Sequence, residues 1–174
     1  RDHLAVFAPS YDGLILQPTL DSQSDTDSAH RCYALPRRGV TLSSTGRIDV
    51  NVPLEVPFDA LHDGAVVTVE TRTGVNFNES VVAPSLRIQV PVGSQPITVN
   101  FAKDCLASDI LVVAAPNQQV NIVANGAFRG RVSGTGNVNL HFTQPQTMEE
   151  FSLRTSRAAV QGEITTDVLD VMAG

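Results

Sequence analysis

Cysteine and long apolar runs are both scarce in this chain, and each shortage excludes a class of protein. The only two cysteines, Cys32 and Cys105, lie in no CxxC or Cys/His spacing, so the sequence predicts no zinc site. A disulfide between them and two unrelated thiols both stay open, since connectivity cannot be read from a sequence. The longest apolar run, residues 110–115, is far shorter than the roughly 18 residues that span a bilayer, so no membrane span is predicted.

Positive charge is scarce as well. Lysine and arginine number 12 against 18 acidic residues, which gives a net charge of −6, and Lys103 is the only lysine. Nucleic-acid binding depends on clustered cations that neutralise phosphates, so nucleic acid is not an expected partner.

Catalytic and cofactor motifs are also absent from the sequence. There is no GxSxG nucleophile elbow, and none of the four histidines adjoins a candidate nucleophile. Gly134 and Gly136 lack the third glycine of a dinucleotide fingerprint, and the acidic residues 21–27 lack the glycine and glutamate of an EF-hand loop. The sequence therefore predicts a protein that is not an enzyme, with no cofactor, no metal and no evident small-molecule substrate.

What the chain has instead is apolar alternation. Apolar residues alternate with polar ones along four stretches: residues 48–54, 86–92, 97–101 and 138–142. Side chains two apart share one face of a strand, so each stretch predicts a strand with one buried face. Turn signals such as Gly74, Pro84 and Gly126 interrupt the apolar runs after roughly ten residues. The pattern indicates an all-β fold.

The architecture that this rhythm predicts is a β-solenoid or a flattened β-sandwich of short strands, with an irregular N-terminal arm. Short strands separated by small polar corners in residues 120–171 favour a coil that turns repeatedly in one sense. The single helical candidate is residues 147–151, where Thr147 stands in the manner of an N-cap and Pro145 limits the helix to about one turn.

At 174 residues the chain has the length of one domain, and its pattern divides it into two parts. Residues 45–174 form the β-rich domain, and residues 1–44 form the N-terminal arm. Within the arm, residues 21–31 are expected to form a mobile acidic loop, because residues 21–28 have no apolar side chain to anchor them.

Four segments combine Gly, Asn and β-branched residues in a way that points to a known family: residues 48–54, 120–126, 134–138 and 153–162. In these segments the chain resembles the β-solenoid "putative adhesin" family of bacteria and eukaryotes, which has a mitochondrial member in animals. The resemblance implies a solenoid fold and carries no catalytic residue. With Arg1 in place of an initiating Met, it favours a processed N-terminus and a mitochondrial location over a secreted or cell-surface one.

The arm supplies one group of candidate partner-binding residues. It is more apolar than a loose terminus should be, so its apolar side chains need a surface to cover, either on the chain's own sheet or on a neighbouring protein. These side chains are Leu4, Val6, Phe7, Leu14, Ile15 and Leu16.

Arginines supply the second group. Arg129 and Arg131 flank Gly130, and we expect them to bind an acidic protein partner. Arg154 and Arg157 would extend them into a basic ladder if successive coils are in register. Ordinary ion pairs with Glu149, Glu150 and Glu163 are the alternative.

We therefore expect a non-catalytic structural or accessory subunit of a larger assembly, which acts through contacts with other protein subunits. The alternative is a secreted or surface adhesin-like binding module. The glycosylation sequon at Asn78 would carry glycan only in that second case.

Overall fold

The structure, a computed structural model, describes residues 3–7, 14–17, 30–32, 39–44, 46–55, 66–93 and 95–173. Up to residue 40 it describes the backbone alone.

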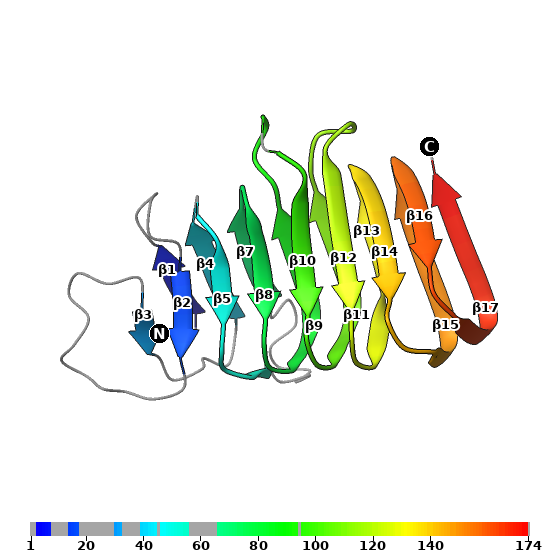
Figure 1. Ribbon diagram of the computed structural model, residues 1–174, viewed down its shortest axis with the longest axis horizontal. Coiled ribbons are helices and arrows are strands. Elements are labelled where there is room, and N and C mark those ends of the chain that lie inside the picture. The colour runs from blue at the N-terminus through cyan, green and yellow to red at the C-terminus, as the bar shows by residue number, and fades with distance from the viewer. Residues whose placement is uncertain are drawn as a thin grey trace.

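The described residues form 17 strands in two sheets, and they contain no helix (Figure 1). In spatial order, the first sheet holds β1 (His3–Phe7), β4 (Gly39–Ser44), β7 (Val66–Thr71), β9 (Val81–Gln89), β11 (Cys105–Val113), β13 (Phe128–Gly134), β15 (Gln146–Thr155) and β17 (Ile164–Ala173), and β6 (Leu54–Glu55) pairs with the beginning of β9. The second sheet holds β16 (Arg157–Gln161), β14 (Asn137–Phe142), β12 (Gln119–Ala124), β10 (Ile97–Phe101), β8 (Gly74–Phe77), β5 (Ile48–Val50), β2 (Leu14–Gln17) and β3 (His30–Cys32).

The chain winds as a β-solenoid. From β7 onward it alternates between the two sheets, and each strand pairs in parallel with strands one turn away rather than with its neighbour in sequence, as β10 does with β8 and β12 (Figure 1). This confirms the all-β fold and decides between the two expected architectures in favour of the solenoid. Each turn takes roughly 20 residues, as in other repeat proteins.

The core lies between the two sheets, where inward side chains stack in files. One file in the second sheet consists of Ile48, Val75, Val99, Ile122 and Leu140, all of them buried. A file in the first sheet consists of Leu86, Ile110, Val132 and Leu153, which are fully buried. Burial of each such side chain stabilises the folded chain by about 1.5–3 kcal/mol. The alternation in the sequence places these apolar side chains on the inward face of every turn.

Phenylalanines join the two sheets through the middle of the core. Their rings form a continuous series of four contacts, with centroids 5.0 to 6.3 Å apart, through Phe77, Phe101, Phe128, Phe142 and Phe151. Phe128 and Phe151 come from the first sheet and the other three from the second. The ring of Phe128 therefore reaches across the core between strands of the opposite sheet.

Long strands of the first sheet bend in their middle. In β11 the bend interrupts the alternation with two adjacent exposed residues, Ser108 and Asp109. One turn before β9, the two halves are the separate strands β6 and β7. Pro84 lies at this bend inside β9, so the expectation of a turn there is wrong. A proline is tolerated at such an irregular position because the ladder does not need its missing N–H.

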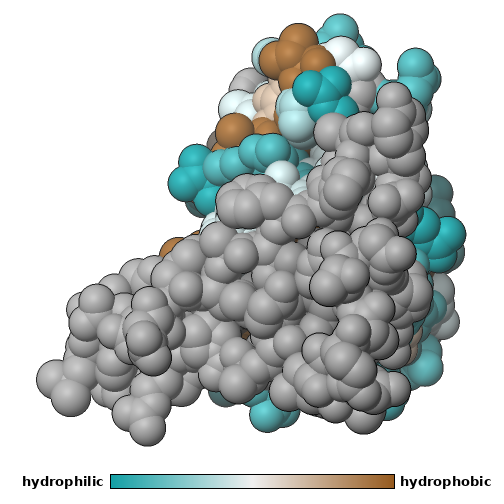
Figure 2. Space-filling view, turned by 90° about the vertical axis from the view of Figure 1, so that its left-hand side faces the viewer, coloured by the Kyte–Doolittle hydropathy of each residue, from teal (hydrophilic) through white to brown (hydrophobic). Residues whose placement is uncertain are grey.

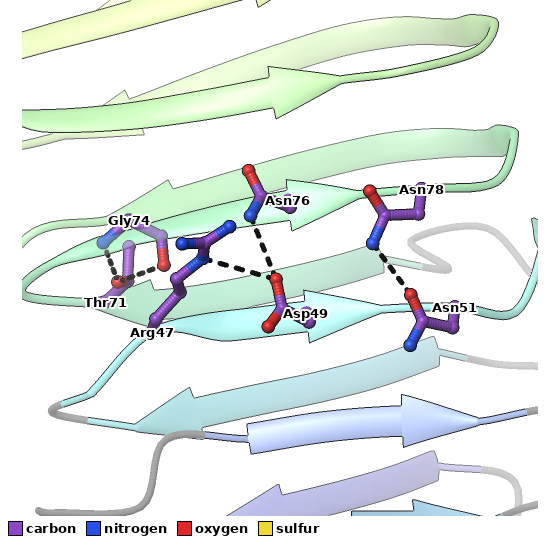
Figure 3. A network of polar contacts seen from close by, with 7 residues as sticks. All are labelled: Arg47, Asp49, Asn51, Thr71, Gly74, Asn76 and Asn78. Atoms are coloured by element: carbon purple, nitrogen blue, oxygen red, sulfur yellow. Dashed lines mark hydrogen bonds and ion pairs between the residues drawn. The ribbon is translucent and has the colours of Figure 1, made fainter.

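A buried hydroxyl closes the tight connection between β7 and β8. The Thr71 hydroxyl accepts the Gly74 N–H at 2.8 Å and donates to the Gly74 carbonyl at 3.0 Å (Figure 3). Gly74 has a φ of +149°, and a Cβ there would lie 2.7 Å from the Thr98 carbonyl oxygen. The turn signal at Gly74 therefore reflects a close approach that only glycine allows.

Polar side chains also tie successive turns together on the outer side. Asn76 donates to the Asp49 carboxylate at 2.9 Å, and Asn78 donates to the Asn51 side chain at 2.7 Å (Figure 3). Arg47 pairs with the same Asp49 carboxylate at 3.3 Å. In Figure 2, which looks along the solenoid from the end that carries β1 to β3, the described residues that can be seen are mostly hydrophilic.

The helix expected at residues 147–151 is wrong, because these residues belong to β15. Met148 and Phe151 are buried, Glu149 and Glu150 between them are exposed at the bend, and the segment pairs in parallel with β17. A single helical turn would form few hydrogen bonds, whereas the strand forms a ladder over ten residues. Tertiary pairing therefore overrides the local capping signal.

Strands before residue 45 extend both sheets. β1 pairs with β4, β4 pairs with β7, and β2 lies between β5 and β3. Both sheets therefore continue into strands before residue 45, although β2 and β3 follow each other within the second sheet and do not alternate between the sheets as later strands do. The division into an arm and a domain stays a prediction, and residues 21–29 of the predicted acidic loop lie outside the described residues.

Candidate functional site

A groove opens in the first sheet where β13 and β15 separate. β15 pairs with β17 from Gln146 to Thr155, but with β13 only from Ser152 to Arg154. Beside the unpaired part of the two strands lies a groove of about 520 Å³. Ala107 and Met148, both buried, lie at its base.

Gln146, the first residue of β15, lies at one end of this split. The side chain is 5% exposed, and its amide donates to the Gly126 carbonyl at 2.8 Å and accepts the Phe128 N–H at 3.1 Å. Two backbone groups that a neighbouring strand would otherwise satisfy are thus paired by one side chain. This arrangement keeps the split open without leaving those buried polar groups unpaired.

Charged side chains line the mouth of the groove: Arg129, Arg131, Glu149, Glu150 and Asp167. Arg131 pairs with Glu150 at 2.9 Å, and the two side chains are 66% and 44% exposed. An ion pair this exposed contributes at most about 1 kcal/mol. Within the described part of the chain, Arg129, Glu149 and Asp167 form no ion pair, so the mouth presents one free cation and two free carboxylates.

The structure brings together only two of the four arginines expected in a basic ladder. Arg129 and Arg131 line the groove, and the pairing of Arg131 with Glu150 is the ordinary ion pair considered above. Arg154 pairs with Asp170 on β17 at 2.7 Å, while Arg157 begins β16 in the second sheet. A ladder of four arginines is therefore wrong. That Arg129 and Arg131 bind a protein partner stays a prediction.

The apolar residues of the arm fall on two strands. Leu4, Val6 and Phe7 lie in β1, and Leu14, Ile15 and Leu16 lie in β2. By register, Val6 stands beside Leu42 in β4, and Leu16 beside Val50 in β5. Their role in binding a partner stays a prediction.

The other candidate surface lies at β16 and β17, the last two strands that the structure describes. Among the described strands, β16 pairs with β14 alone and β17 with β15 alone (Figure 1). Leu169 and Val171 stand in register with Phe151 and Leu153, which are fully buried, yet they are 65% and 43% exposed. We call the inward residues of these two strands, Ala158, Val160, Leu169 and Val171, the end layer.

Sequence reasoning missed the end layer. The alternation in residues 164–173 resembles that of the internal strands, so nothing local marks it as exposed. Only the position of β17 at the edge of the sheet does so. Val168 and Met172, on the same strand, are also about half exposed, at 49% and 54%.

Cys105 offers no reactive site by its position. Cys105 is a free, fully buried thiol, and burial raises its pKa far above the ordinary value, which is the opposite of what a nucleophile needs. β3, which carries Cys32, and the turn of β10 and β11 are four strand spacings apart, roughly 19 Å along the solenoid. A disulfide requires Cα atoms within about 7 Å, so these two residues do not bond in this fold.

The described residues hold no group of three or more His, Cys, Asp or Glu side chains arranged to bind a metal ion. They also contain no helix with the length and apolar character to cross a membrane.

No family model, no curated protein and no solved structure matches this chain. The resemblance to the "putative adhesin" family therefore stays a prediction. What the chain does has to be argued from the groove and the end layer.

Proposed function

We propose that this chain is a non-catalytic structural or accessory subunit of a larger protein assembly, and that it acts through protein–protein contacts made by its end layer. The observation that carries the proposal is the exposure of Leu169 and Val171, which stand in register with the buried core residues Phe151 and Leu153 but are 65% and 43% exposed. A mitochondrial location belongs to the same proposal and rests on the sequence alone.

Physical chemistry supports this use of the end layer. Apolar side chains at core positions gain roughly 25 cal/mol for each Å² that a partner removes from water. β16 and β17 are also the outermost described strands at this end of the two sheets, and an outermost strand can pair with a partner strand. Both features belong to the same end of the molecule, so one partner can meet both.

The test compares variants in extracts of cells that make the protein. Leu169→Lys combined with Val171→Lys places two charges in the end layer, and Val92→Lys is the matched control, since Val92 is 82% exposed in the connection between β9 and β10. Under native separation by size, we expect the wild type and the Val92 variant to migrate in a complex. The double variant should migrate as the lone chain while circular dichroism shows that it is folded. Identical migration of all three would disprove the proposal.

A surface binding module is the second candidate, and the groove between β13 and β15 favours it. Arg129 and Glu149 form no ion pair with another described residue and are available to pair with charges on a ligand. Intact mass of the protein from its native source discriminates the two candidates. Glycan on Asn78 indicates a secreted module, whereas an unmodified Asn78 is the result expected for a mitochondrial subunit.

A further inference from the structure

The split between β13 and β15 has features that identify a ligand. We infer that the groove there binds an extended peptide segment of a partner protein, which pairs by its backbone with the edge of β13 that the split leaves open and places a lysine or arginine side chain beside Glu149 and Asp167. The inference goes beyond the proposed function, because the groove and the end layer have no residue in common.

Gln146 shows how an amide is held at this edge. Its side-chain amide donates to the Gly126 carbonyl at 2.8 Å and accepts the Phe128 N–H at 3.1 Å. The two groups that it meets are two residues apart along the chain, which is also the spacing at which a residue of a parallel strand meets its neighbour. The glutamine amide thus takes the place of the first residue of an added strand.

The edge of β13 stays open beyond this amide. Backbone groups on one side of a strand recur every second residue, so the Phe128 carbonyl and the Gly130 N–H come next on this side. No residue of β15 stands in register with either, because the pairing of the two strands starts at Arg131 and Ser152. Gly130 lines the groove, and without a side chain it presents only backbone there. The amides of an extended peptide can pair with such an edge.

The groove also has the size and the lining of a peptide site. Its volume of about 520 Å³ lies within the roughly 300–1,000 Å³ of typical ligand sites. Its base is apolar, at Ala107 and Met148, and its mouth is charged. An extended peptide turns alternate side chains to opposite sides, so one set meets the apolar base while the other set meets the charges.

Charge at the mouth favours a basic side chain in the ligand. Glu149 of β15 and Asp167 of β17 are neighbours in the parallel register of these strands, and both line the groove. Neither forms an ion pair with another described residue, and like charges side by side on a sheet are destabilising. A lysine or arginine of the ligand relieves this repulsion and gains two attractions. Arg129 lies on the β13 side and repels the same group, which fixes the side of the groove that the basic residue takes.

The first test is affinity selection on the immobilised full chain, from a library of end-blocked hexapeptides in which valine alternates with randomised residues. The wild type should retain peptides enriched about threefold or more in lysine and arginine at the randomised positions. Glu149→Lys should lose this enrichment. Glu55→Lys is the matched control and should keep it, because Glu55 is an exposed carboxylate on β6 that does not line the groove.

The second test uses the selected peptide that binds most tightly, with its Kd for the full chain measured by fluorescence anisotropy. Two versions carry N-methyl groups on one or the other alternate set of amides. Methylation of the set that faces β13 should raise the Kd roughly tenfold or more, because it removes backbone hydrogen bonds and leaves every side chain in place. A ligand held by its side chains alone would keep its Kd in both versions.

Three outcomes of the peptide tests overturn the inference: no peptide retained above the level of Glu149→Lys, enrichment in acidic residues, and a Kd that neither methylation changes. Retention of cellohexaose in place of peptides would overturn it as well, since the groove would then be a sugar site. The variant with Leu169→Lys and Val171→Lys should bind the selected peptide with the wild-type Kd. The same variant tests the proposed function in cell extracts, so failure of one proposal is distinguishable from failure of the other.

Discussion

A larger side chain at Ala124 should partly compensate for the stability that is lost when the Phe128 ring is removed, although the two residues lie in opposite sheets. Phe101, Ala124 and Phe142 occupy one file of the second sheet. The ring centroid of Phe128 lies 6.3 Å from that of Phe101 and 5.4 Å from that of Phe142. The Phe128 ring therefore packs between these two rings, where the small side chain of Ala124 leaves space. The two residues form one packing unit although they belong to different sheets.

The magnitudes follow from this geometry. Phe128→Ala should cost about 3–5 kcal/mol of unfolding free energy, which includes two aromatic contacts of about 0.5–1.5 kcal/mol each. Ala124→Leu alone should cost about 1–3 kcal/mol, because it forces extra volume against the ring. In the double variant the leucine occupies the space that the ring has left, so the combined cost should be smaller than the sum by about 1–3 kcal/mol.

Urea unfolding followed by far-ultraviolet circular dichroism measures these free energies, and a constant slope with urea shows that the transition stays comparable. Phe128→Ala combined with Ala83→Leu is the control, because Ala83 is a buried alanine two turns away in the first sheet and its effect should add. Simple additivity of Phe128→Ala and Ala124→Leu would refute the argument that the ring fills the space above Ala124.

Three further predictions concern the buried thiol, the split sheet and the arm. Burial raises the pKa of Cys105, so above about pH 8.5 only the unfolded chain loses the thiol proton. In that pH range the wild type should lose about 1.4 kcal/mol of unfolding free energy per pH unit relative to Cys105→Val, because deprotonation stabilises the unfolded state alone. Urea unfolding at several pH values measures this slope. Gln146→Leu should cost about 2–4 kcal/mol in the same assay even though leucine suits the buried position, because the Phe128 N–H and the Gly126 carbonyl lose their partner; an unchanged stability would contradict the bridging role. Deletion of residues 1–20 removes β1 and β2, which pair with β4 and β5, and should therefore lower the thermal stability of the remaining chain. Loss of the complex at an unchanged thermal stability would show that the arm is an interface, whereas unchanged partners would show that it is not.

Local pattern alone predicted several strands of this protein. The alternation at residues 97–101 and 138–142 predicts β10 and β14 because period-two burial is a property of each segment by itself. The same local reasoning misread residues 147–151, since the capping signal is local while the ladder with β17 is not. Pro84 was misread for the same reason, because only the bend in the first sheet makes a place for it.

The sequence by itself determined an all-β chain whose segments each bury one face, and with it the absence of any local catalytic signature. Only the tertiary structure decided the order of the strands. That order places β3 and β11 far apart and opens the split that Gln146 bridges. It also leaves Leu169 and Val171 exposed, although their counterparts one turn earlier, Phe151 and Leu153, are buried. The physical reason is that a residue's burial in a solenoid depends on the turns stacked before and after it, which lie about 20 residues away and leave no mark on the local pattern.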